Sequence, residues 1–144
     1  MCLELRKNVK LFISKRNKIV FKYVIEQAED GIYTTLFQRS KVTIGDGSIV
    51  TSDLILQKNM YGNDVCEIGL HSFPSIASAL KVRGVALLED YKNSFNVRLV
   101  KCWIPIGTKY YMGKFHSSTS CASDKLIYRE VVNIEHDVHV CLYF

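Results

Sequence analysis

Short runs of β-branched and aromatic residues, each followed by a turn signal, recur along most of this chain. The first two runs, residues 9–13 and 19–25, flank the polar stretch Ser-Lys-Arg-Asn-Lys at 14–18. Runs of this length and composition are typical of strands, and the turns at 29–31, 44–48 and 58–64 contain glycine. The strands predicted in this way cover residues 9–13, 19–25, 32–37, 52–56, 65–70, 95–104, 125–134 and 138–144.

One segment has the pattern of a helix. Ser72 or Ser75 can cap its first amides, and Pro74 suits a first turn. Gly84 is a natural end signal. The apolar residues at helical spacing are Ile76, Ala77, Ala79 and Leu80. A second short helical turn is expected within residues 85–91.

Together these elements predict an α+β fold, with one principal helix packed on a mostly antiparallel, strongly curved sheet of about seven strands. The length of 144 residues and the absence of a repeat or linker predict a single domain over residues 1–144. In the run 19–25, side chains alternate between the two faces of the strand. Val20, Lys22 and Val24 share one face, and we expect the aromatic face with Phe21 and Tyr23 to point inward.

Composition excludes several classes of protein. The chain has no run of 18 apolar residues and no secretory signal at its start, so we expect a protein of the cytoplasm that does not span a membrane. Its five cysteines include no C-x-x-C pair, which fits neither a disulfide framework nor a zinc site. Most cysteines are therefore expected to be reduced thiols in the core, and neither a metal nor another cofactor is predicted.

Positive charge is concentrated at the start of the chain. Residues 1–22 hold seven Lys and Arg against Glu4 alone, a balance of 7 minus 1, or +6, whereas the whole chain carries +5. Two interpretations stay open. The lysines protect an exposed strand edge from aggregation, or they attract an anionic partner such as a nucleotide or an acidic protein.

Three features carry groups that could perform chemistry. On a C-terminal strand, Asp137, His139 and Cys141 would share one face, where they could bind zinc or form a Cys-His pair, or simply line a polar edge. Cys2 could become an N-terminal thiol nucleophile, or it could be an ordinary terminal cysteine. His71 could meet a ligand or satisfy buried backbone groups. No phosphate loop, dinucleotide motif or G-x-S-x-G elbow is present.

The segment 104–114 can form a loop that offers tyrosines for stacking on a planar base and lysines for its phosphate, or its tyrosines can instead pack on the sheet. The hydroxyl-rich residues 116–124 are predicted to form a loop as well. We expect a ligand at the junction between the helix entrance and the tyrosine loop, because free helix amides can bind a phosphate. The predicted ligand-binding residues are His71, Ser72, Lys109, Tyr110, Tyr111, Lys114 and Arg39.

Several motifs together resemble small uncharacterised proteins of phages and gut bacteria. They are the Met-Cys-Leu start, Phe-Lys-Tyr-Val at 21–24, Tyr-Thr-Thr at 33–35, Gly-Leu-His-Ser-Phe at 69–73, Ile-Pro-Ile-Gly-Thr-Lys-Tyr-Tyr-Met-Gly at 104–113 and Ala-Ser-Asp-Lys-Leu-Ile-Tyr at 122–128. The resemblance covers most of the chain and implies a phage or prophage setting, without a particular activity.

Residue types in a second set are similar to the arginine, Ser-Thr-Ser and glutamate of ADP-ribosyltransferase-like domains. Arg39, the run Ser118, Thr119 and Ser120, and Glu130 occur in that order. Only ten residues separate Ser120 from Glu130, which departs from the pattern of those domains.

These observations support three functional hypotheses. The first is a phage-type accessory protein that binds a small anionic, nucleotide-like ligand and so sequesters a host immune signal in the host cytoplasm. The second is a protein-interaction or virion-associated module, and the third is an ADP-ribosyltransferase-like or Cys-dependent enzyme, with non-enzymatic binding preferred. Nucleic acid and membrane are not expected partners, and self-association stays open.

Overall fold

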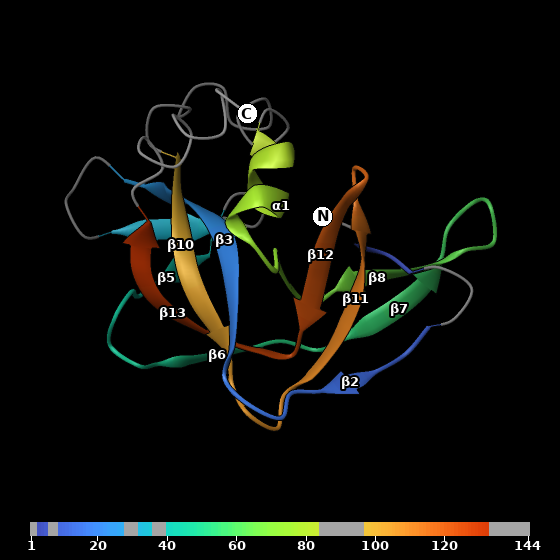
Figure 1. The fold of residues 1–144 in the computed structure, drawn as a ribbon, viewed down its shortest axis with the longest axis horizontal. Coiled ribbons are helices and arrows are strands. Elements are labelled where there is room, and N and C mark those ends of the chain that lie inside the picture. Colours follow the sequence, from blue (N-terminus) through green and yellow to red (C-terminus); the bar gives the residue numbers. More distant parts are fainter. Residues whose placement is uncertain (1–2, 6–8, 28–31, 36–39, 84–96, 133–144) are drawn as a thin grey trace.

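The computed structural model describes residues 3–5, 9–27, 32–35, 40–83 and 97–132. These residues form thirteen strands, paired antiparallel in two sheets, and one short helix (Figure 1). The prediction of a mostly antiparallel sheet with one helix is confirmed, and the class is α+β or mostly β. The prediction of one sheet of about seven strands is not confirmed, because the strands form two sheets. The predicted strand 138–144 and helical turn 85–91 lie outside the described residues.

The first sheet, which we call sheet A, has seven strands. Their order is β7 (Ile55–Lys58), β8 (Asp64–Ile68), β1 (Leu3–Glu4), β11 (Lys109–Phe115), β12 (Ser118–Ser123) and β9 (Leu70–Ser72), with β2 (Phe12–Ile13) paired to β11.

The second sheet, sheet B, has six strands. Their order is β5 (Lys41–Val42), β4 (Tyr33–Thr35), β3 (Lys18–Glu26), β10 (Val97–Ile104), β13 (Lys125–Val132) and β6 (Ile49–Thr51). Phe21 of β3 also pairs with Phe73, which follows β9, so the two sheets are joined by backbone hydrogen bonds.

Helix α1 (Ile76–Lys81) lies between β3 and β12 in Figure 1. Ser75 caps the helix as predicted, and Ser78 completes a capping box. The helix is tied to both sheets, because the Tyr23 hydroxyl donates to the Ala79 carbonyl and the Ser118 hydroxyl donates to the Ser78 carbonyl. In the described residues, no helix is long and apolar enough to cross a membrane.

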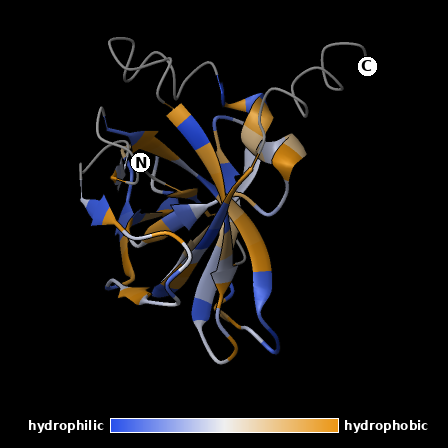
Figure 2. Ribbon diagram, turned by 90° about the vertical axis from the view of Figure 1, so that its left-hand side faces the viewer, coloured by the Kyte–Doolittle hydropathy of each residue, from blue (hydrophilic) through white to orange (hydrophobic). Residues whose placement is uncertain are grey.

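Both faces of β3 are buried, which corrects the prediction that only its aromatic face points inward. Tyr23 and Ile25 pack against α1, as expected for the inward face. Val20 and Val24, on the opposite face, belong to the core between the two sheets. Many strands show bands of polar and apolar residues (Figure 2). β3 differs because apolar clusters pack against both of its faces.

The two loops predicted at 104–114 and 116–124 are mostly strands β11 and β12. His116 and Ser117 form the two-residue turn between them, with φ of 46° and 65°. A turn of this kind usually has Asn-Gly, so its sequence signal is absent. The serines of β12 are buried, and their hydroxyls donate to main-chain carbonyls of neighbouring elements, as Ser120 does to Ser72. These hydrogen bonds offset the cost of burying the hydroxyls.

Candidate functional site

His71 and Ser72 lie in β9 and are both buried. The His71 ring places Nδ1 3.1 Å from the Gly69 carbonyl oxygen and Nε2 3.1 Å from that of Cys66. Burial, and then the charge of Lys22, lower the His71 pKa to about 4, although the two carbonyls act in the opposite direction. Of the two roles considered for His71, the geometry fits the satisfaction of a buried carbonyl, because a neutral ring donates from one nitrogen to one of these two oxygens.

The helix start does not offer the phosphate site expected beside Ser72. The helix begins at Ile76, and the Ser75 hydroxyl already accepts a hydrogen bond from the Ser78 amide. A helix of six residues that is capped by its own side chains has little left to attract an anion. The helix therefore does not contribute free amides to the predicted junction.

The predicted tyrosines and lysines alternate between the two faces of β11. Tyr111 lies in register with Ala122 of β12, which lies in register with His71, so these three share one face of sheet A. Tyr110 and Lys114 share the other face, where the Lys114 ammonium donates to the Thr119 hydroxyl at 3.0 Å. Tyr110 and Tyr111 consequently cannot cover the same base. Arg39 lies outside the described residues.

The pairing of β2 with β11 brings Lys10, Phe12 and Lys18 from the basic start of the chain close to Tyr110. Phe12 lies opposite Tyr110 in register, and the two rings stack with centroids 5.4 Å apart and planes 19° from parallel. The Lys10 ammonium lies 5.1 Å from the centre of the Phe12 ring, and the Lys18 ammonium 5.8 Å from that of Tyr110. We call Lys10, Phe12, Lys18 and Tyr110 the aromatic–lysine cluster.

More positive charge surrounds this cluster. The turn at 14–17 is held against the turn at 105–108, because the Ser14 amide donates to the Thr108 carbonyl and the Ile106 amide donates to the Asn17 side chain. Lys15 and Arg16 are exposed on the first of these turns. Lys109, also exposed, begins β11 directly after the second. Sequence reasoning missed Phe12, because the pairing of residues 12 and 110 is nonlocal.

A second polar group lies in the core between the sheets. The Lys22 ammonium donates to the His71 carbonyl at 2.7 Å, and burial lowers the Lys22 pKa to about 8. Within the part of the chain that the structure describes, the buried hydroxyls of Ser72 and Tyr128 have no hydrogen-bond partner. Burial raises the pKa of Tyr128, with a smaller contribution from Cys102.

The thiols of Cys102 and Cys121 are not activated nucleophiles. Cys66, Cys102 and Cys121 are buried. Burial raises the pKa of both Cys102 and Cys121 to about 12, so these thiols stay protonated at neutral pH. Cys2 and the set Asp137, His139 and Cys141 lie outside the described residues. Among the residues described, no group of three His, Cys, Asp or Glu side chains is placed to hold a metal ion.

The residues that resemble an ADP-ribosyltransferase set are separated in the fold. Ser118 and Ser120 are on β12 of sheet A, with their hydroxyls turned to main-chain carbonyls. Glu130 is exposed on β13 of sheet B, where it pairs with Lys101 at 3.6 Å. The geometry does not gather them at one place.

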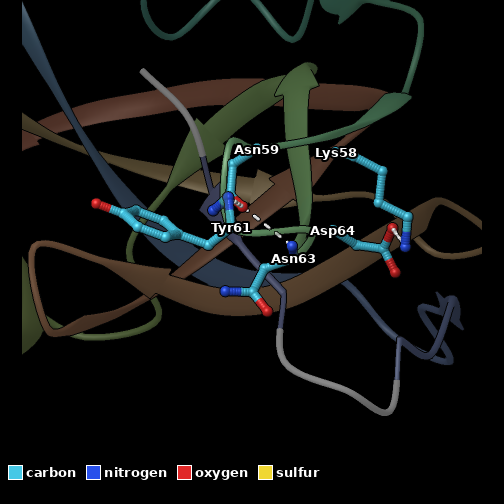
Figure 3. Close-up of polar contacts among 5 residues, drawn as sticks. All are labelled: Lys58, Asn59, Tyr61, Asn63 and Asp64. Atoms are coloured by element: carbon cyan, nitrogen blue, oxygen red, sulfur yellow. Dashed lines mark hydrogen bonds and ion pairs between the residues drawn. The ribbon is translucent and has the colours of Figure 1, made fainter.

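A hairpin tip provides a contrasting exposed aromatic residue. Tyr61 is 80% exposed in the turn between β7 and β8. The Asn59 side-chain oxygen accepts from the Tyr61 and Asn63 amides, and Lys58 pairs with Asp64 at 2.8 Å (Figure 3). The turn is held by these local contacts, and they include no ring stack.

Comparison of the chain with family models, curated proteins and solved structures found no match in any of the three.

Proposed function

We propose that this protein binds a small anionic, nucleotide-like ligand at the aromatic–lysine cluster. The observation that carries the proposal is the Phe12–Tyr110 stack with a lysine ammonium over each ring. A planar base gains stacking energy on an aromatic face, and a phosphate is attracted to ammonium groups. The cluster combines aromatic rings, from the cross-strand pair Phe12 and Tyr110, with two ammonium groups beside them.

The backbone supports a site that is ordered before the ligand arrives. Phe12 and Tyr110 are held by strand pairing, and the adjoining turns are joined by main-chain hydrogen bonds. Binding would therefore cost little conformational entropy for ordering these rings.

The strand order supports the strongly curved sheet that we propose for this region. β8 and β9 are separated in sequence by Gly69 alone, but they are the second and sixth strands in the order of sheet A.

The biological role that we propose is that of a phage-type accessory protein that sequesters a nucleotide-like host signal in the host cytoplasm. This role needs binding alone. This binding role agrees with the protonated state of the Cys102 and Cys121 thiols and with the separation of the serines of β12 from Glu130.

The test is calorimetry and native mass spectrometry with a panel of mononucleotides, dinucleotides and cyclic dinucleotides. Tyr110→Ala should weaken binding of the best nucleotide by about 1 to 3 kcal/mol, the usual effect of losing one base–aromatic stack. Lys18→Ala and Lys10→Ala should also weaken it, and their effect should be larger at low salt.

Tyr61→Ala is the matched control, because it removes an exposed tyrosine that lies outside the cluster. It should bind the nucleotide as the parent does. The proposal fails if no nucleotide binds at tens of micromolar, or if Tyr110→Ala and Tyr61→Ala bind equally well while both remain folded by circular dichroism.

A further inference from the structure

Four apolar side chains form a row across the outer face of sheet B. Ile19 of β3 is in register with Trp103 of β10, Trp103 with Ile127 of β13, and Ile127 with Ile49 of β6. Ile19 is 47% and Ile49 55% exposed, and the two residues between them are half-buried. Residues in register point to the same face of a sheet, so these four, which we call the apolar strip, form one continuous surface.

The strip is the part of this face that α1 leaves uncovered. Nearer the other end of β3 and β10, Tyr23 and Leu99 pack against Ala79 and Val82 of the helix segment. β6 lies at the end of the sheet away from α1 (Figure 1). A row of four strands spans about 14 Å at the usual strand spacing, which is wide enough to receive a peptide segment.

The charges beside the strip are mostly positive. Among the described residues of the four strands that carry the strip, Lys101, Lys125 and Arg129 lie on this face with one carboxylate, that of Glu130, a balance of 3 minus 1, or +2. Glu130 is paired with Lys101. The Arg129 guanidinium lies over the Trp103 ring, 4.2 Å from its centre, and Trp and Arg are enriched among the residues that contribute most to binding at interfaces.

We propose that the apolar strip binds a protein segment whose apolar side chains are flanked by carboxylates. Apolar side chains would cover Ile19, Trp103 and Ile49, and the carboxylates would meet Arg129 and Lys125. The positive rim argues against a second copy of this chain as the occupant, because two identical rims would repel each other.

The experiment selects a displayed library of short random peptides on the full chain, with counter-selection on a variant that carries both Ile49→Glu and Lys125→Glu. Both positions are exposed, so the variant should fold. Enriched peptides should combine aromatic or aliphatic residues with Asp or Glu. Their synthetic forms should bind the double variant at least about tenfold more weakly, as expected on losing interface contacts of about 1.4 kcal/mol.

Met60→Glu with Lys58→Glu is the matched control, since it makes the same kinds of change on the exposed hairpin tip. The control should bind the selected peptides like the parent. Neutral or basic consensus peptides, equal binding to both double variants, or no enrichment would overturn the proposal. Self-association that the Ile49→Glu and Lys125→Glu changes abolish would overturn it as well, because it would identify a second copy as the occupant.

This proposal is independent of nucleotide binding. The peptide should bind equally to Tyr110→Ala, and a saturating nucleotide should not displace it. Failure of either proposal therefore leaves the other to be judged on its own result.

Discussion

The imidazole of His71 shows how one buried side chain makes stability depend on pH. Both of its nitrogens face main-chain carbonyls, but burial and the Lys22 charge keep the ring neutral at pH 7, with a pKa of about 4. In the unfolded chain the pKa returns to about 6.5. Between these two values the unfolded state binds more protons than the folded state, so the free energy of unfolding falls as the pH falls.

We expect His71 to account for about 3 kcal/mol of stability lost between pH 6.5 and pH 4. Urea denaturation at a series of pH values should show this loss in the parent and a shallower pH dependence in His71→Gln. His116→Gln, a change at an exposed histidine, is the control and should follow the parent. Parallel pH profiles for the parent and His71→Gln would contradict the assignment.

Lys22 shows where alternation in a sequence is misleading. Its pattern with Val20 and Val24 predicted a face turned away from the core, yet that face lines the core between the sheets. The ammonium is retained there because it reaches the His71 carbonyl, 49 residues away. A partner at such a distance cannot be read from local pattern, and the same is true of Phe12 and Tyr110.

At the scale of elements, the strands and turns with strong local signals could be predicted. The predicted strands 19–25 and 95–104 correspond to β3 and β10, and Gly45 and Gly47 have the positive φ that their turn requires. β12 could not be predicted, because its serines are stabilised in a strand by carbonyls of β9 and α1. Tyr110 and Tyr111 lie on strand β11 rather than on the loop that was one of their two expected places.

The contact of β1 with β11 depends on Gly113. A Cβ at this position would overlap the Glu4 carbonyl oxygen and lie 3.0 Å from the Leu3 side chain. Gly113→Ala should therefore push β1 away from β11 and destabilise the protein by about 1 to 3 kcal/mol, the usual cost of overpacking. Hydrogen exchange should show loss of protection at the amides of β1 and β11.

Gly107→Ala is the control for this change. Gly107 has φ of +82° but open space around it, so alanine there costs backbone strain of about 1 to 2 kcal/mol without touching β1. Its exchange pattern at β1 should match the parent. Intact protection of β1 in Gly113→Ala would show that the close approach to Glu4 is not a real constraint.

At the scale of the whole molecule, the two sheets share one core. Val20, Val100 and Leu126 of sheet B pack in the same cluster as Cys121 of sheet A, with Met112 against it. The Phe21–Phe73 bridge and the Lys22–His71 hydrogen bond cross between the sheets. Neither sheet can expose its inner face without uncovering the other.

We therefore expect both sheets to unfold in one cooperative transition, and Phe73→Ala to lower the stability of both together. Phe73 is 3% exposed and contacts Tyr23 edge to face, so its truncation should cost about 3 to 5 kcal/mol. Trp103, the single tryptophan, reports on sheet B by fluorescence, and amide exchange of β12 reports on sheet A. The two probes should give the same urea midpoint in the parent and shift by the same amount in the variant. If β12 loses protection at a lower urea concentration than the Trp103 transition, the sheets are separate units, because coincident transitions are required of a two-state domain.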